Sequence, residues 1–474
     1  MMVLWDRKTL LSVMNGVAIG YLPEVFSGVS IDSRTLVSGD IFFCIKGNHL
    51  DGHDFAAHAH AKGAGVLIVE KNRLDEMKKI AAPLIVVSDV LQALERLAQA
   101  ARERSKARII AITGSVGKTT TKEALKLALE TVGKVHANLA SLNNCWGVPL
   151  TLARMPMESD YGIFEIGMNH RDEIRPLVKL VRPHVAVITH IAAGHMGFFK
   201  NLEEIADAKA EIFEGLDDEG VALLNADSDF FSYLTQKAER CGVKKIVSFG
   251  EAHHADYQAK KICFLDDFSR VVMFFWGREL IIEIGASGRH SVHNSLAVVA
   301  ACDIVGADLE RAALALRSFS LPKGRGLCYQ LSLPDGGEFH LIDESYNANP
   351  ASMCAALDLL ATGPIGPGGR RIAILGDMLE LGIYSEKFHR DLVKPVRACG
   401  ANPVFLFGKE MKSLAIDLSA GADIEVRYAE RVEDIVPPII SEITRGDLVM
   451  IKSSHGVRSS HIVTALLDHY KLIK

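Results

Sequence analysis

The chain has 474 residues, about three times the roughly 150 residues that serve as a first guess for one domain, so its length favours two to four domains. Hydrophobic residues make up 49% and charged residues 23%, which is unlike a disordered, collagen-like or disulfide-stapled chain. Lysine and arginine total 53 against 58 aspartate and glutamate, a net charge of −5, and no block of like charges occurs. Because binding to nucleic acid needs a concentrated basic face, a nucleic-acid partner is not expected.

The eight cysteines lie singly along the chain, without a CxxC pair or a short-range cluster. This spacing is typical of free thiols in a reducing compartment. The first nine residues contain Asp6, Arg7 and Lys8 where a secretion signal needs an apolar core, and no uncharged apolar run approaches the roughly 18 residues of a membrane span. We therefore expect a cytoplasmic protein with no membrane span.

Short apolar runs alternate with helical patterns along the chain, which is typical of βαβ units on parallel sheets and predicts the α/β class. The first part, residues 1–88, contains many glycines and is predicted to form a small N-terminal α/β module without a phosphate loop. The runs that predict strands are, in chain order, residues 66–69, 84–87, 109–112, 161–165, 185–188, 340–343, 371–375, 404–407 and 448–451.

Two further domains are predicted after this module. A helix over 90–104 leads into the strand at 109–112, so a second domain should span 89–320 and hold a P-loop ATPase-like parallel sheet. A helix over 309–318 ends before Leu321-Pro322-Lys323-Gly324, where proline and glycine interrupt the pattern. The alternating strands and helices beyond it predict a C-terminal, Rossmann-like doubly wound domain over 321–474.

The strongest local pattern is a buried strand, a glycine turn and a helix start, with the sequence Thr113-Gly114-Ser115-Val116-Gly117-Lys118-Thr119-Thr120. Glycines let backbone N–H groups close around phosphate oxygens, Lys118 neutralises charge, and the Thr119 hydroxyl can hold Mg²⁺. A chance Gly-Lys-Thr at a helix start is the other interpretation, but strand, turn and helix all argue for a nucleoside triphosphate. A guanine-reading Asn-Lys-x-Asp sequence is absent, which disfavours a GTPase, whereas a kinase or motor stays possible on this loop alone.

Further along the chain, Glu165, His195 and Lys209 are candidates for metal or phosphate chemistry. Glu165 ends an apolar strand, where an α/β nucleotide domain places a metal-binding acid, although such an acid can also simply face solvent. His195 follows the carboxyl end of the strand at 185–188, and its position alone leaves a structural and a functional role equally open. Lys209 lies on a helix whose apolar stripe is at 205, 208 and 212, and spacing by itself favours an ordinary solvated lysine.

The loop at 113–120 resembles the ATP loop of the Mur ligase family, the ligases that form amide bonds in peptidoglycan precursors. Further segments resemble the branch of that family that uses D-alanyl-D-alanine, and together they cover all three predicted domains. They are Asp32-Ser33-Arg34, Asp51-Gly52-His53, the run from Asn143 and Asn144 to Leu152, the run from Asp343 through Tyr346, Asn347 and Asn349 to Pro350, and the run from Leu375 to Gly382.

The resemblance implies an ATP-dependent ligase that joins D-alanyl-D-alanine to the carboxylate of UDP-N-acetylmuramoyl-tripeptide through an acyl phosphate. ATP and two Mg²⁺ ions are the implied cofactors, the two substrates are the implied partners, and a monomer is expected. The N-terminal domain would take the UDP-sugar, the central domain ATP, and the C-terminal domain the amine.

The same resemblance implies roles for single residues. Lys118 and Thr119 would hold the ATP phosphates and one Mg²⁺, with Glu165 and His195 as metal-binding residues. Lys209 matches the lysine that the family carbamylates, which turns a cation into a carboxylate-like anion able to approach a second Mg²⁺. The remaining implied contacts are Asn294, Arg325 and Asp343 for the nucleotide, and Ser33, Arg34, Asn143, Asn144, Tyr346, Asn347 and Asn349 for substrate.

Two features limit or rival this interpretation. Residues 452–459, Lys-Ser-Ser-His-Gly-Val-Arg-Ser, depart from the family's usual Lys-Gly-Ser-Arg-Gly-Met-Arg-x-Glu pattern, so no role is assigned there. The histidines at 49, 53, 58 and 60 match no known metal-ligand spacing, and a polar turn followed by a helix is expected instead.

Two alternative functions remain open. The chain could be another ATP-dependent ligase of the superfamily, such as folylpolyglutamate synthetase, or a non-catalytic nucleotide-binding protein.

Overall fold

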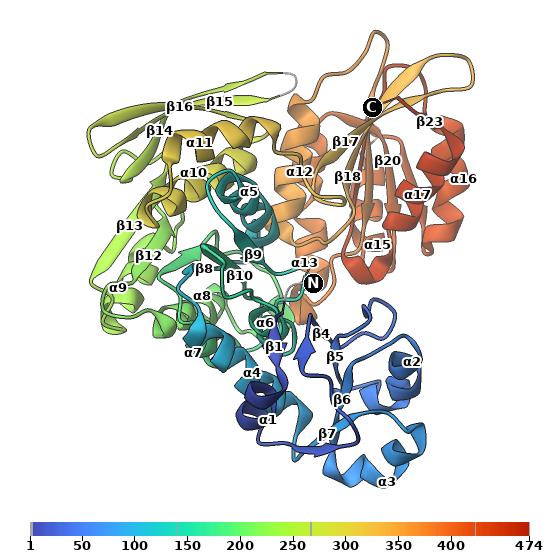
Figure 1. Cartoon of the computed structure of the whole chain (residues 1–474). Coiled ribbons are helices and arrows are strands. Elements are labelled where there is room, and N and C mark those ends of the chain that lie inside the picture. The colour runs from blue at the N-terminus through green and yellow to red at the C-terminus, as the bar shows by residue number, and fades with distance from the viewer. Residues whose placement is uncertain (1–2, 140, 266–267, 422, 474) are drawn as a thin grey trace.

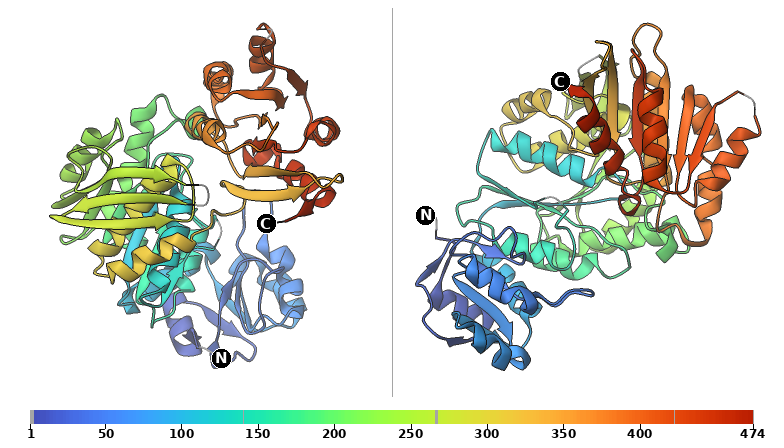
Figure 2. Two further views of the ribbon diagram at one scale, coloured as in Figure 1. Left: turned by 90° about the horizontal axis from the view of Figure 1, so that it is seen from above. Right: turned by 90° about the vertical axis from the view of Figure 1, so that its right-hand side faces the viewer.

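The computed structural model describes residues 3–139, 141–265, 268–421 and 423–473. Three β-sheets with their helices form three modules, which Figure 1 shows in blue, in cyan to yellow, and in orange to red along the chain. Figure 2 shows the same three modules from two other sides. The predicted α/β class with three modules is therefore confirmed, and within the described residues no helix is long and apolar enough to cross a membrane.

The N-terminal module is a five-stranded sheet in the order β2-β7-β6-β5-β4, beside a β1-β3 ribbon. In β6 the residues alternate between two cores: Val66 and Ile68 face α1 and α4, whereas Leu67 and Val69 face α2 and α3. A strand buried on both faces must be apolar throughout, which is why the sequence pattern revealed it. The elements are β1 (Trp5–Asp6), α1 (Arg7–Met14), β2 (Val17–Ile19), β3 (Val25–Phe26), β4 (Val29–Ser30), β5 (Ile41–Phe43), α2 (Ala56–Ala61), β6 (Val66–Glu70), α3 (Leu74–Met77), β7 (Leu84–Val87) and α4 (Val90–Arg104).

The middle module is a nine-stranded sheet in the order β16-β15-β14-β13-β12-β11-β8-β10-β9. Ile109 and Ala111 of the central strand β8 face the core under α6, α7 and α8, and Ile110 and Ile112 face the core under α5 and α10. The elements are β8 (Arg108–Thr113), α5 (Lys118–Glu130), β9 (Val135–Ala137), α6 (Gly147–Ala153), β10 (Tyr161–Glu165), α7 (Ile174–Val181), β11 (Val185–Ile188), α8 (Leu202–Ala210), β12 (Val221–Asn225), α9 (Phe231–Arg240), β13 (Lys245–Gly250), β14 (Tyr257–Phe264), β15 (Ser269–Phe275), β16 (Arg278–Ile284), α10 (Arg289–Ile304) and α11 (Leu309–Ala315).

This sheet is parallel, as predicted, from β9 to β14, but β14, β15 and β16 run antiparallel to one another. The sequence analysis did not anticipate this edge. Buried and more exposed residues alternate along β15, the pattern of a strand with one face in solvent, and the apolar run at 271–276 was not among the runs from which strands were predicted.

The C-terminal module is a seven-stranded sheet in the order β21-β20-β19-β22-β18-β17-β23. Its strands from β21 to β18 are parallel and have helices on both faces, which is the predicted doubly wound arrangement. The elements are β17 (Leu327–Ser332), β18 (Glu338–Glu344), α12 (Pro350–Thr362), β19 (Arg371–Gly376), α13 (Ser385–Arg390), α14 (Val393–Ala398), β20 (Ala401–Phe407), α15 (Lys412–Ser419), β21 (Val426–Ala429), α16 (Val432–Glu442), β22 (Leu448–Lys452), α17 (Ser460–His469) and β23 (Lys471–Leu472).

The modules share cores where they meet. The apolar face of α4 lies in the core of the first sheet, together with Leu150 and Ala153 of α6 from the middle module. Trp5 of the first strand donates its indole N–H to the carbonyl of Ala153 at 2.9 Å. A second cluster runs from the middle module into the C-terminal one and includes Phe199 and Leu381. The ranges 1–88, 89–320 and 321–474 therefore remain a prediction, because α4 belongs to two packing units at once.

Candidate active site

The phosphate loop turns between the carboxyl end of β8 and the N-terminus of α5. Gly117 has a φ of +85°, a conformation that residues with a side chain rarely adopt, and a Cβ there would lie 2.5 Å from Oδ1 of Asn294. Gly114 lies as tightly against the side chain of Thr189. The packing leaves no space for a side chain at either glycine, and it brings Asn294 of α10 to the loop.

The end of β11 braces the loop from the neighbouring strand. Ser115 donates its backbone N–H to the carbonyl of His190 at 2.7 Å, and its hydroxyl to the carbonyl of Ala192 at 2.8 Å. The hydroxyl of Thr189 donates to the carbonyl of Val116 at 2.6 Å. These bonds hold the loop in one shape before any ligand arrives. Of the other loop residues, Thr113 donates its hydroxyl to the carbonyl of Ile166 at 2.8 Å, and Thr120 is buried on α5.

The predicted metal acid lies beside the first residues of α5. The Thr119 hydroxyl donates to Oε2 of Glu165 at 2.8 Å, and Nδ2 of Asn143 donates to Oε1 at 2.7 Å. The backbone N–H of Glu165 donates to Oδ1 of Asn138 at 2.6 Å. The carboxylate is 1% exposed, so these neutral donors balance a buried anion and hold both of its oxygens in place.

Two lysines from different helices, Lys118 and Lys209, lie close to each other at the phosphate loop. Lys118 donates from Nζ to the carbonyl of Gly114 at 2.7 Å, folding back over the loop. Burial lowers the pKa of Lys118, the Glu165 carboxylate opposes that shift, and Arg325 adds to it. Lys209 on α8 is 2% exposed, and burial, with the nearby Lys118, lowers its pKa well below the usual lysine value. Lys209 is therefore no ordinary solvated lysine, although its spacing on the helix favoured that interpretation.

His195 lies at the junction with the C-terminal module. It has a φ of +59°, and its Nδ1 is 2.5 Å from Oε2 of Glu380. The hydrogen bond with His195 lowers the pKa of Glu380. The N–H of Gly197 donates to the carbonyl of Glu380 at 2.7 Å, so the two modules are joined at this point by main chain and side chain. A bond at Nδ1 leaves Nε2 as the nitrogen that can face a metal ion.

The segment that joins the second and third modules passes close to the loop. Asp343, at the end of β18, accepts the N–H of Gly324 at 2.9 Å and the hydroxyl of Ser345 at 2.5 Å. Arg325 stacks over the ring of Tyr346, with its guanidinium carbon 4.0 Å from the ring centre. Arg325 also lowers the pKa of Lys118, so this predicted nucleotide contact lies close to the phosphate loop, and Asp343 in β18 holds the neighbouring Gly324.

Asn347 and Asn349 follow β18 and make hydrogen bonds within the C-terminal module. Asn349 caps α12 by accepting the N–H of Ser352 at 2.9 Å, and its Nδ2 lies close to Gly194 of the middle module. The carbonyl of Asn347 accepts from Nζ of Lys452 at 3.0 Å. The divergent segment 452–459 therefore packs against the predicted substrate residues, with the Ser454 hydroxyl donating to the carbonyl of Ala348 at 3.2 Å.

The remaining predicted substrate residues are in different surroundings. Asn144 accepts the N–H of Gly147 at 2.9 Å, so its side chain is engaged in starting α6. Ser33 and Arg34 lie in the N-terminal module, where the Ser33 hydroxyl is 2.9 Å from Nδ1 of His58 and the exposed Arg34 pairs with Asp32. The structure thus brings Thr119, Glu165, Lys118 and Asn294 together around the phosphate loop and leaves the two predicted UDP contacts in a separate module.

The donors at Glu165 fit Mg²⁺ only with help from a ligand. Thr119 and Glu165 offer hard oxygen atoms, but in the described part of the chain no group of three or more His, Cys, Asp and Glu residues could hold a metal ion. Mg²⁺ commonly keeps one or two protein oxygens and takes the rest from phosphates and water. The residues present therefore fit a metal ion that arrives with ATP, and within the described residues the histidines at 49, 53, 58 and 60 belong to no such group.

Sequence reasoning missed two residues of this site. Asn138 follows the short strand β9, which no apolar run had marked, and its role appears only through its bond to Glu165. Glu380 lies in the quoted segment 375–382, but nothing in that segment indicates that it meets His195, 185 residues earlier in the chain.

The fold and the site define a nucleotide-binding protein with three modules, and comparison with known sequences gives its family. Three family descriptions match: "Mur ligase family, catalytic domain" over residues 25–102, "Mur ligase middle domain" over 112–302, and "Mur ligase, glutamate ligase domain" over 333–455. The chain belongs to the Mur ligase family.

Within that family, the chain is similar to proteins named UDP-N-acetylmuramoyl-tripeptide--D-alanyl-D-alanine ligase. The protein of that name from Rickettsia prowazekii is 35% identical, with 99% of this chain and 100% of the relative covered. The Escherichia coli protein is 34% identical, with 97% and 98% covered. Among solved structures, a MurF from Acinetobacter baumannii is 29% identical, with a TM-score of 0.84 and 98% and 99% of the two chains covered.

Proposed function

We propose that this chain is an ATP-dependent ligase that joins D-alanyl-D-alanine to the terminal carboxylate of UDP-N-acetylmuramoyl-tripeptide. The observation that carries the proposal is the site itself: Thr119 is bonded to Glu165 below a rigid phosphate loop, with Lys118 and the buried Lys209 beside it. Relatives with this activity in their names match over nearly the whole chain, and they support the assignment of substrates over the folylpolyglutamate synthetase alternative.

The chemistry follows from what a carboxylate needs before an amine can attack it. The γ-phosphate of ATP is transferred to the tripeptide carboxylate, which gives an acyl phosphate and ADP. The amine of D-alanyl-D-alanine attacks the acyl carbon, phosphate leaves, and the amine loses a proton. In such a transfer the protein mainly positions the groups and neutralises charge, and Lys118 at the phosphate loop supplies both.

Two Mg²⁺ ions are part of the proposal, and when bound they would supply positive charge that neutralises the phosphates. Thr119 and Glu165 would hold one ion, and His195, through Nε2, would help to orient it. Lys209 would reach the second ion after carbamylation. Its burial favours the neutral amine, which attacks the carbon of CO₂ and releases a proton to leave an N-carboxylate.

Substrate placement follows the three modules. Ser33 and Arg34 would receive the UDP end in the N-terminal domain, and Asn143 and Asn144 the muramoyl-peptide. Asn294, Arg325 and Asp343 would contact the nucleotide. The C-terminal domain, with Tyr346, Asn347 and Asn349, would place the amine. We propose the ranges 1–88, 89–320 and 321–474 for these domains, and a monomer in the cytoplasm.

Phosphate release tests this function directly. The wild-type protein is given ATP, Mg²⁺ and UDP-N-acetylmuramoyl-tripeptide, with D-alanyl-D-alanine, with glutamate, or with no amine. Sustained release only with D-alanyl-D-alanine supports the proposal, release with glutamate favours the folylpolyglutamate synthetase alternative, and no release with any amine favours a non-catalytic binding protein. Lys118→Ala should lose turnover by a factor on the order of a thousand, because it removes charge from the phosphoryl-transfer site; normal release by this variant would refute the mechanism.

A further inference from the structure

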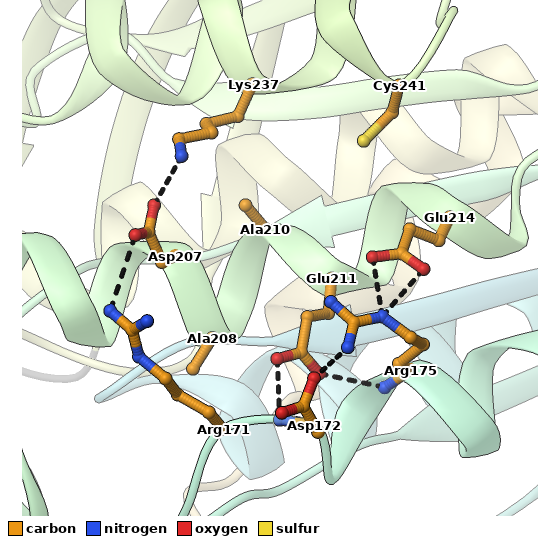
Figure 3. Close-up of a pocket in the computed structure, with 10 residues that line it drawn as sticks. All are labelled: Arg171, Asp172, Arg175, Asp207, Ala208, Ala210, Glu211, Glu214, Lys237 and Cys241. Atoms are coloured by element: carbon orange, nitrogen blue, oxygen red, sulfur yellow. Dashed lines mark hydrogen bonds and ion pairs between the residues drawn. The ribbon is translucent and has the colours of Figure 1, made fainter.

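A buried carboxylate on the helix of Lys209 has no part in the mechanism above. Glu211 begins the short helical turn that directly follows α8, and it is 6% exposed. Two residues along a helix are about 200° apart, so Glu211 and Lys209 point to opposite sides of the same helix. Lys209 lies close to Lys118 at the phosphate loop. Glu211 lines a polar pocket of about 280 Å³ between α7, α8 and α9 (Figure 3).

Within this pocket Glu211 binds main chain. Its Oε1 accepts the N–H of Asp172 at 2.7 Å, and its Oε2 accepts the N–H of Arg175 at 3.0 Å (Figure 3). These N–H groups lie at the N-terminus of α7, whose own N-cap residue, Glu173, makes no capping bond and instead accepts the N–H of Asn169 at 2.7 Å. Glu211 therefore supplies from another helix the acceptors that the start of α7 requires.

Asp172, which is hydrogen-bonded to Glu211, has a strained backbone conformation. Asp172 has a φ of +67°, which costs a residue with a side chain on the order of 1 kcal/mol or more and persists only when its surroundings enforce it. Asp172 donates its backbone N–H to Glu211, and its carboxylate pairs with the Arg175 guanidinium.

The two hydrogen bonds that Glu211 accepts connect the helix of Lys209 with the segment that follows Glu165. The segment 166–173 begins directly after Glu165, at the end of β10, and leads into α7. On the other side, Glu211 is two residues from Lys209. His170 in the same segment packs against Phe198, with ring centres 4.6 Å apart, three residues after His195. One pair of hydrogen bonds thus ties the helix of Lys209 to the segment that leaves Glu165.

We propose that Glu211 is a positioning residue for the metal site: by clamping the start of α7 it sets the separation between Glu165 and Lys209 without contacting ATP or metal. The inference rests on the proposed function, which makes these two residues metal-binding. Carboxylates that orient metal ligands from outside the coordination sphere typically change metal affinity by about 10- to 100-fold when replaced. A misplacement of about 1 Å has a similar effect on rate.

The test compares two equal substitutions in one pocket. Glu211→Gln keeps the size of the side chain but replaces one acceptor with an NH₂ group that opposes a backbone N–H. Glu214→Gln is the matched control, because Glu214 accepts from the Arg175 side chain at 2.8 Å, pairs with Lys179 at 3.4 Å, and has no bond to the main chain of α7. Mn²⁺ binding to each protein with a non-hydrolysable ATP analogue is measured by electron paramagnetic resonance, and UDP-N-acetylmuramoyl-tripeptide binding is measured by calorimetry.

We expect Glu211→Gln to weaken Mn²⁺ binding by about tenfold or more and to leave binding of the UDP-sugar within about twofold, with Glu214→Gln close to the wild type in both. Glu211→Asp keeps the charge but is too short to reach both N–H groups, so it should weaken Mn²⁺ binding as well, and it serves as the test if the glutamine variant does not fold. Wild-type Mn²⁺ affinity in a folded Glu211 variant, or equal losses in the control, would overturn this inference alone. A wild-type protein that binds no Mn²⁺ with the analogue would count against the proposed function as well.

Discussion

Lys209 offers a prediction in which stability and activity move in opposite directions. Its side chain is 2% exposed on α8, and among the described residues no hydrogen bond or ion pair to its ammonium is present. A cation buried without a partner destabilises the folded state. Lys209→Met replaces it with an apolar chain of similar length, so the variant should unfold at a higher temperature than the wild type in CO₂-free buffer while losing ligase turnover.

The difference in stability between the wild type and the Lys209→Met variant depends on pH. Because the folded-state pKa of Lys209 is lowered, the folded protein binds one proton fewer than the unfolded chain between that lowered pKa and the ordinary lysine pKa. In that window the stability of the wild type rises, relative to the methionine variant, by up to about 1.4 kcal/mol per pH unit. As the pH rises through that window, the advantage of the variant should therefore shrink, and the melting temperatures of the two proteins should converge.

Calorimetric melts of both proteins across this range, in CO₂-scrubbed buffer, measure the difference directly. Parallel melting curves at all pH values would show that Lys209 does not change its protonation on folding, and a less stable methionine variant would show that the lysine is well accommodated. Added bicarbonate should raise the melting temperature of the wild type only, because a ligand that reacts with the folded state alone stabilises it.

Three further predictions concern the loop and the two junctions. Gly117→Ala should weaken binding of an ATP analogue at least tenfold, about 1.4 kcal/mol, because its φ of +85° and the contact with Asn294 both oppose a Cβ; unchanged affinity in a calorimetric titration would contradict this. Glu380→Gln should raise the radius of gyration of the ligand-free protein in X-ray scattering, because its charged bond to His195 at 2.5 Å joins two modules; an identical curve would show that this bond does not hold them together. Trp5→Phe should lower the free energy of unfolding in urea by about 1–2 kcal/mol, because the carbonyl that accepts its buried indole N–H loses its partner, and a change well below that range would argue against the bond.

Much of the architecture could be predicted because it depends on local pattern. Strands buried on both faces, such as β6 and β8, are continuous apolar runs, and the helix over 90–104 was predicted to the residue. The antiparallel strands β14 to β16 were not predicted: the apolar run at 271–276 was not used, and the alternating burial of β15, with one face towards solvent, appears only in the structure. The limits of the domains were harder to predict, because α4 packs into the core of the first module and also contacts α6 of the middle module.

By itself, the sequence determined the α/β class, the phosphate loop at 113–120 and the candidates Glu165, His195 and Lys209, since each follows from a motif, a strand end or a family resemblance. The tertiary structure alone decided what surrounds them. It buried Lys209 beside Lys118, set Asn138 against Glu165 and brought Glu380 to His195. Burial and pairing between residues far apart in the chain arise from how sheets and modules pack, and no local window of sequence contains that information.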